Sequence, residues 1–118
     1  MLRVASRFYV LKVTLAIRTP KTMNSFIAAY DLHKIRDYGP VIELLTKSGA
    51  VRLQESMWLV LSPASAQAVL DAILTALDGD DSLAVIELPR GATWEITGAT
   101  REAAAWLSTN VTPARVLA

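Results

Sequence analysis

At 118 residues, with 53% hydrophobic and 19% charged residues, the chain has the size and composition of one compact globular domain, and disorder is excluded. It contains no cysteine, which excludes a disulfide framework, a thiolate nucleophile and a zinc–thiolate site. Charged residues interrupt each long apolar run, so no run is long enough to cross a bilayer, and we expect a cytoplasmic protein without a membrane anchor.

The net charge of +1 hides an uneven distribution of charge along the chain. Residues 1–22 hold five Lys and Arg residues and no acid, which leaves seven basic against eleven acidic residues in the remainder, a balance of −4. Non-specific binding to nucleic acid comes largely from Lys and Arg that displace counterions from phosphates. The acidic body is therefore a poor phosphate binder unless its basic residues cluster, a partner chain helps or a divalent cation bridges.

The basic extension 1–22 precedes the first clear structural pattern, and Met23 resembles a natural start. Two interpretations stay open: a mis-assigned upstream start codon, or a targeting segment or basic arm. In the second case, Phe8 to Ile17 could form an extra strand. We expect one domain over residues 23–110 and a short tail, 111–118.

The body opens with a strand and a helix. Phe26 to Leu32 is a short apolar run with an aromatic residue near each end, which is typical of a strand. A helix is predicted from about Asp37, which can cap it, to Gly49, which can stop it, with Pro40 tolerated in the first turn. Asp31 ends the apolar run either as a charged turn residue or as a group that does chemistry.

A hairpin, a second helix and a strand follow. Val51 to Leu61 alternates in two halves around Glu55-Ser56, which predicts two strands joined by a tight turn or bulge. Ser62-Pro63 opens a helix that ends at Asp78-Gly79. Leu83 to Leu88 is predicted to be a strand with apolar residues on both faces.

The order strand, helix, strand, strand, helix, strand predicts an α+β, ferredoxin-like βαββαβ sandwich, an antiparallel sheet with both helices on one face. The other face would be uncovered and would carry Trp58 and other large residues. An exposed apolar patch usually marks a partner surface, so we expect a homodimer that forms through the sheet, with Trp58 in its interface. Thr93 to Ile96 and a short helix from Thr100 through Leu107 would close over the sheet edge or the other subunit.

Asp31 is the leading candidate for chemistry. One carboxylate offers at most two oxygens to a hard cation, but a two-fold axis brings the same residue in from two chains. Two Asp31 carboxylates could hold one Mg²⁺ that polarises a phosphodiester and lowers the pKa of a bound water. His33, the single histidine, is more typical of a solvated loop, and the acidic stretch Asp78 to Asp81 is more typical of a solvated turn.

Three stretches resemble the CRISPR-associated Cas-two family and especially its stand-alone SinR-like relatives. They are "YDL" at 30–32, "DYGPVIELLTKSGA" at 37–50 and "LQESMWLV" at 53–60, the last being similar to the family's Gln-x-Ser-x-aromatic signature. "DGDDSLAVIEL" at 78–88 and Trp94 resemble the SinR-like branch. The resemblance runs from Asn24 to about Asn110 and covers none of residues 1–22.

The resemblance implies a ferredoxin-like homodimer in which Asp31 is a catalytic residue and the metal ligand at the dimer interface. It also implies that Gln54 and Ser56 lie in a strand–turn segment near that site, and we expect Ser56 to be a second catalytic residue and Gln54 to position the phosphate or the water. Family members are metal-dependent nucleases that act on RNA or DNA, or architectural subunits that hold DNA for spacer integration. Related VapD proteins are toxin-like ribonucleases on the same fold.

Two hypotheses remain open. In the first, the chain is a Mg²⁺-dependent endoribonuclease or nuclease dimer, which the strand-end carboxylate and the matched signature favour. In the second, it is a non-catalytic dimer that binds nucleic acid or protein in a CRISPR adaptation or toxin–antitoxin system, with an integrase or an antitoxin as partner. The acidic body and the shortage of catalytic residues favour the second. A small-molecule-sensing module is a third class, for which the sequence offers no ligand motif.

Overall fold

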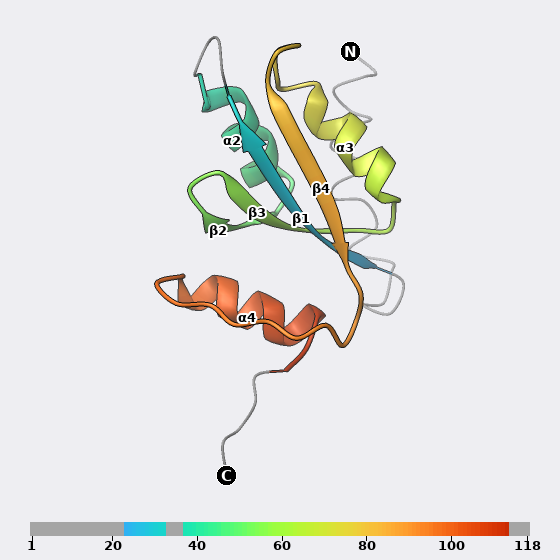
Figure 1. Cartoon of the computed structure of the whole chain (residues 1–118), viewed down its shortest axis with the longest axis vertical. Coiled ribbons are helices and arrows are strands. Elements are labelled where there is room, and N and C mark those ends of the chain that lie inside the picture. The colour runs from blue at the N-terminus through green and yellow to red at the C-terminus, as the bar shows by residue number, and fades with distance from the viewer. Residues whose placement is uncertain (1–22, 33–36, 114–118) are drawn as a thin grey trace.

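The structure, a computed structural model, describes residues 23–32 and 37–113 (Figure 1). Phe8 to Ile17 and His33, which the sequence singled out, lie outside the described residues. The described part holds, in chain order, β1 (Asn24–Asp31), α2 (Gly39–Lys47), β2 (Val51–Gln54), β3 (Met57–Ser62), α3 (Ala66–Leu74), β4 (Ser82–Leu88) and α4 (Arg101–Asn110). The predicted α+β class is confirmed. Within these residues, no helix is long and apolar enough to cross a membrane.

The four strands form one antiparallel sheet in the order β2-β3-β1-β4. This order is compatible with the ferredoxin-like type that the sequence predicted. β1 is a central strand, and Phe26 lies opposite Val60 of β3 and Glu87 of β4. The first strand of the described chain therefore pairs with both later strands, β3 and β4.

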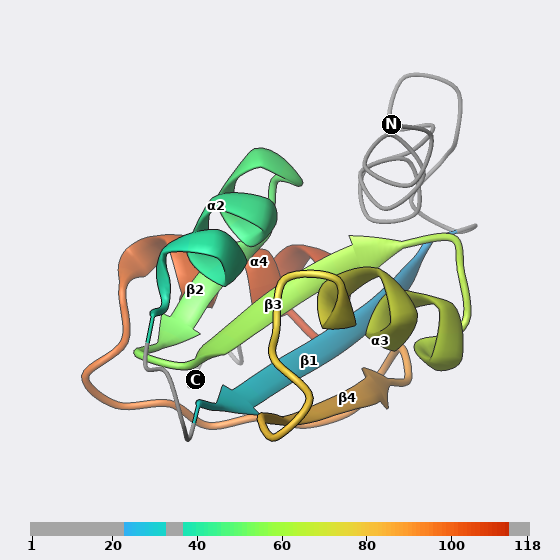
Figure 2. The same ribbon diagram turned by 90° about the horizontal axis from the view of Figure 1, so that it is seen from above.

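Helices α2 and α3 cover one face of the sheet, as predicted. Figure 2 looks onto the sheet with these two helices in front and α4 behind. The core on this side contains side chains from β1, β3 and both helices: Phe26, Ala28, Tyr30, Val41, Leu44, Leu45, Trp58, Val60, Val69 and Ile73. Strand alternation explains the set, because every second residue of a strand faces the same way.

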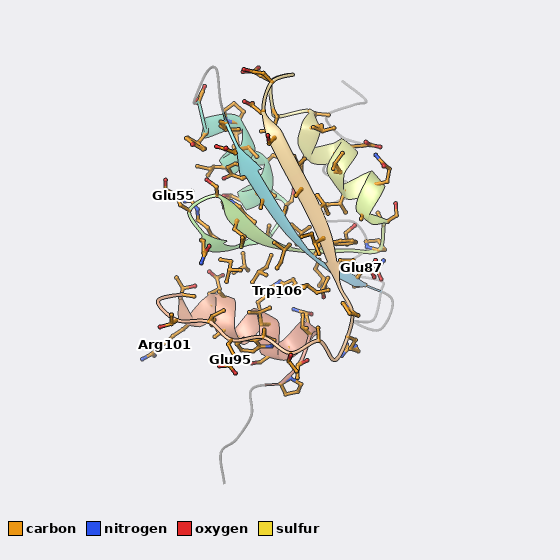
Figure 3. All side chains as sticks on the ribbon, viewed as in Figure 1. Glu55, Glu87, Glu95, Arg101 and Trp106 are labelled. Carbon is orange, nitrogen blue, oxygen red and sulfur yellow. The ribbon has the colours of Figure 1, made fainter. Side chains whose placement is uncertain are left out.

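The other face of the sheet is partly covered, so the prediction that it is left uncovered is wrong. α4 packs across it through Ala103 and Leu107, which form a second buried cluster with Leu59 of β3 and Val111. Trp106 joins this cluster, and Figure 3 shows it on the sheet side of α4. The apolar face of the C-terminal helix thus buries, within one chain, a surface that we expected a second chain to cover.

A set of hydrogen bonds ties α4 to the segment that leads into it. Trp94 Nε1 donates to the Thr112 carbonyl at 2.9 Å, and the Gly91 N–H donates to the Val111 carbonyl at 3.0 Å. The Thr112 hydroxyl donates in turn to the Ala92 carbonyl. The segment before α4 and the residues after it are therefore held side by side.

Trp58 also lies elsewhere than predicted. It is 4% exposed and packs under the helices α2 and α3, so its assignment to an uncovered face is wrong, while its role in a dimer interface stays a prediction. The hairpin predicted around Glu55-Ser56 is confirmed, but β3 is apolar on both faces, and alternation alone could not tell which face α2 and α3 cover. The indole N–H of Trp58 has a buried hydrogen-bond partner on the helix side, the Tyr30 hydroxyl.

The helix ends follow ordinary capping chemistry. The side chains of Ser65 and Thr100 accept hydrogen bonds from the third backbone N–H beyond them and so cap α3 and α4. Asp37 was predicted to cap α2; the N-cap is Tyr38, but the Asp37 carboxylate still accepts the Gly39 N–H at 3.0 Å. Gly49 follows α2 with φ +83°, a conformation that favours glycine.

Candidate functional site

Asp31 is the last residue of β1 and is exposed to solvent. It lies opposite Ser82, the first residue of β4. Strand alternation places it on the same face as Ile27 and Ala29, the face that α4 covers. Ile27 packs against the α4 cluster, but Ala84, opposite Ala29, is exposed, so this face is open at the Asp31 end.

The β2–β3 turn is bonded directly to the end of β1. The Tyr30 N–H donates to the Ser56 carbonyl at 3.1 Å, one residue before Asp31. The structure thus brings the Ser56 turn and the Asp31 strand end together. Whether Ser56 acts on a substrate stays a prediction.

Gln54 is further away. It is exposed at the end of β2, opposite Met57 of β3, and β3 lies between β2 and β1. Two strand spacings amount to about 10 Å, so Gln54 would reach a group at Asp31 only through a bound substrate or water.

Arg52 fixes the turn that carries Ser56. Its Nε and Nη2 donate to the Glu55 carbonyl at 3.1 and 2.8 Å, and its guanidinium lies 5.2 Å from the centroid of the Trp58 ring. Both contacts restrict the turn, since a planar guanidinium can bond and stack at once. Sequence reasoning missed this residue; a basic side chain three positions before a turn carbonyl is a weak signal that could have pointed to it.

A buried polar pair supports the end of β1 from the other side of the sheet. Trp58 Nε1 donates to the Tyr30 hydroxyl at 3.1 Å, and the Tyr30 ring lies 6.1 Å from the Tyr38 ring at an interplanar angle of 43°. These contacts link β1, β3 and the start of α2. They hold Tyr30 in place, and Asp31 follows it directly in the chain.

The described residues contain no group of three or more His, Cys, Asp or Glu side chains arranged to hold a metal ion. Asp31 by itself does not fit zinc, which takes three or four protein ligands. It fits Mg²⁺, which keeps several waters and is often bound through one or two carboxylates and substrate phosphates. The acidic turn before β4 is a poorer candidate for a metal site than Asp31, because Asp81 Oδ2 accepts the Asp78 N–H at 2.8 Å and closes the turn.

The described part of the chain is strongly acidic. It holds the four basic residues Lys47, Arg52, Arg90 and Arg101 against all eleven Asp and Glu residues, a formal charge of −7. Figure 3 shows Glu95 and Arg101 on the outer side of the α4 layer, with Glu55 at the hairpin end. The eight other basic residues belong to segments that are not described.

Comparison with known protein families, with characterised proteins and with solved structures finds no match to this chain. The resemblance to the Cas-two family therefore stays a prediction that depends on the short stretches quoted above.

Proposed function

We propose that the chain is a Cas-two-like, Mg²⁺-dependent endonuclease that hydrolyses phosphodiester bonds in RNA or DNA as a homodimer in the cytoplasm. The observation that carries the proposal is the position of Asp31. Its exposed carboxylate lies at the end of β1, directly after Tyr30, whose N–H donates to the Ser56 carbonyl in the β2–β3 turn.

Asp31, Ser56 and Gln54 would have different roles in the reaction. Asp31 of each chain would provide one carboxylate for the cation, with water and the substrate phosphate completing its shell. A bound Mg²⁺ supplies positive charge next to the phosphate and a water of lowered pKa. The Ser56 hydroxyl can donate a hydrogen bond to a phosphate oxygen, and the Gln54 amide can orient the water or the next phosphate.

The acidic residues of the body give a bound cation a second role. From residue 23 onward the chain carries seven basic and eleven acidic residues, a balance of −4, so binding of nucleic acid to this part would require neutralisation at the site of contact. A divalent cation held by Asp31 supplies that neutralisation where the chemistry occurs. Activity should therefore depend steeply on Mg²⁺.

The test is cleavage of RNA and DNA oligonucleotides by the purified full chain, with Mg²⁺ or with EDTA. Asp31→Asn should lower the rate by about 100-fold or more, because charge stabilisation by a metal is worth several kcal/mol in the transition state. Asp71→Asn, an exposed carboxylate on α3, is the matched control and should keep the wild-type rate. An unchanged rate in Asp31→Asn would remove Asp31 from the mechanism.

A second candidate function is favoured by the same acidity. A dimer that binds without catalysis, in a CRISPR adaptation or toxin–antitoxin system, needs no metal, and the balance of −4 over residues 23–118 suits a basic protein partner such as an integrase or an antitoxin. Tight, salt-sensitive binding to a basic partner, together with no cleavage at any Mg²⁺ concentration, would favour this candidate over the nuclease.

A further inference from the structure

The two edges of the sheet are built differently. β2 forms one edge; it is four residues long, carries the exposed Arg52 and is interrupted by a register shift between Arg52 and Gln54. Short length, charge and a bulge are the features by which proteins keep an edge strand from pairing with another chain. The β2 edge is therefore protected.

β4, the opposite edge, is neither short nor bulged, and it carries one charged residue, Glu87. It is seven residues long, pairs with β1 without any register shift from Ser82 to Leu88, and contains neither proline nor a basic residue. Ile86 on this strand is 58% exposed, although it is a large apolar side chain. Figure 2 shows β4 as the outer strand of the sheet, and no further strand pairs with it among residues 23–32 and 37–113.

From this contrast we infer that β4 pairs with β4 of a second copy of the chain, antiparallel and about a two-fold axis at Val85. This pairing goes beyond the proposed function. In this register Ser82 lies opposite Leu88, Leu83 opposite Glu87 and Ala84 opposite Ile86, so that all seven residues of the strand are paired.

The sequence of β4 is compatible with pairing between two copies of this strand. Glu87, the one charged residue of the strand, falls opposite Leu83 and not opposite its own copy, so the pairing places no like charges together. Each Ile86 falls opposite the small Ala84 and lies diagonally from the second Ile86, within reach of it. The exposed apolar surface of one chain would thus cover that of the other across a continuous eight-stranded sheet.

The edge pairing is distinct from the association that the nuclease proposal requires. Asp31 lies next to Ser82, so the two Asp31 residues would be separated by three strand spacings and six residues along the strand, about 25 Å. No single cation spans that distance. Edge pairing and a shared metal at Asp31 therefore fail or succeed independently.

Cross-linking tests the register, because the chain has no cysteine of its own. The full-length double variant Ala84→Cys/Ile86→Cys should form a disulfide-linked dimer on mild oxidation, since directly opposed Cβ atoms are close enough for a disulfide. Leu74→Cys, at an exposed apolar position on α3, is the control and should stay monomeric on the gel. Asp31→Cys should not cross-link through the edge; a cross-link there supports the shared-metal dimer instead.

Sedimentation of the full chain over a concentration series tests the interface itself. An edge of this size predicts weak association, with a Kd on the order of micromolar. Ile86→Lys should abolish the edge-paired dimer and Leu74→Lys should not. A wild-type chain that stays monomeric to about 100 µM, or a dimer that survives Ile86→Lys and does not cross-link through Ala84→Cys/Ile86→Cys, would overturn the inference.

Discussion

The indole N–H of Trp58 and the hydroxyl of Tyr30 form a hydrogen bond of 3.1 Å in a site where both side chains are at least nine-tenths buried. The bond joins the two central strands on the helix-covered side. It holds β1 one residue before the candidate functional group, Asp31.

Removing the acceptor of this bond should destabilise the protein. Tyr30→Phe leaves the Trp58 N–H buried without its partner, which costs about 1–3 kcal/mol of unfolding free energy. Chemical denaturation monitored by Trp fluorescence measures the change. Tyr38→Phe, on the half-buried neighbour whose ring contacts Tyr30, is the control and should change stability by less. Equal losses in the two variants would mean that the Tyr30–Trp58 bond contributes nothing.

The burial of the second sheet face by α4 predicts a large effect of shortening Leu107. This side chain is 3% exposed and packs with Leu59, so Leu107→Ala should lower the unfolding free energy by about 2–4 kcal/mol. Leu74→Ala removes the same atoms from a side chain that is 42% exposed and should cost well under half as much. Thermal unfolding of both variants gives the comparison. Similar losses would show that α4 does not pack against the sheet.

The bond between Trp94 and Thr112 predicts a local effect on α4. Trp94→Phe keeps most of the apolar packing but removes the donor to the Thr112 carbonyl. Amide hydrogen exchange in residues 101–112 should become faster, while exchange in β1 should keep its wild-type rate. Uniform acceleration across both regions would indicate global destabilisation and contradict a local tether.

The N-cap of α4 predicts a smaller loss. Thr100→Ala removes the hydroxyl that accepts the Ala103 N–H at 3.1 Å, and should cost about 1 kcal/mol. Thr109→Ala, at an exposed position within the same helix, is the control and should leave stability within about 0.5 kcal/mol of the wild type. A Thr100→Ala chain as stable as this control would mean that the cap is replaced by water.

The sequence predicted the order of the elements because their patterns are local. Apolar alternation marks the hairpin around Glu55-Ser56, and Thr100 marks the start of the last helix where the structure places it. The second helix was predicted to open at Ser62-Pro63, but it begins three residues later, after the cap at Ser65; Ser62 instead extends β3. Capping residues are common near strand ends, so pattern alone leaves such a boundary uncertain by a few residues.

The arrangement of the layers could not be predicted in the same way. β3 is apolar on both faces, so its alternation is equally compatible with Trp58 under the helices or on the opposite face. The decision depends on partners distant in sequence, above all Tyr30, which is 28 positions away. The cover provided by α4 depends likewise on a bond between Trp94 and Thr112.

Part of the candidate site followed from the sequence, namely the position of Asp31 at the end of the first strand. The contact between the Ser56 turn and Tyr30 depends on the pairing of β1 with β3, which becomes visible only in three dimensions. The role of Arg52 depends on the direction of the Glu55 carbonyl, and the position of a basic residue three places before the turn is only a weak signal of that contact.

The central position of β1 has a consequence for how the chain is made. Both strands that pair with it, β3 and β4, follow it in sequence, and Asp31 precedes its partner Ser82 by 51 positions. At a synthesis rate of about 5–20 residues per second, Ser82 of β4 is added about 3–10 seconds after Asp31 of β1. During that interval the edge of β1 that β4 later covers is unpaired and is open to pairing with another chain.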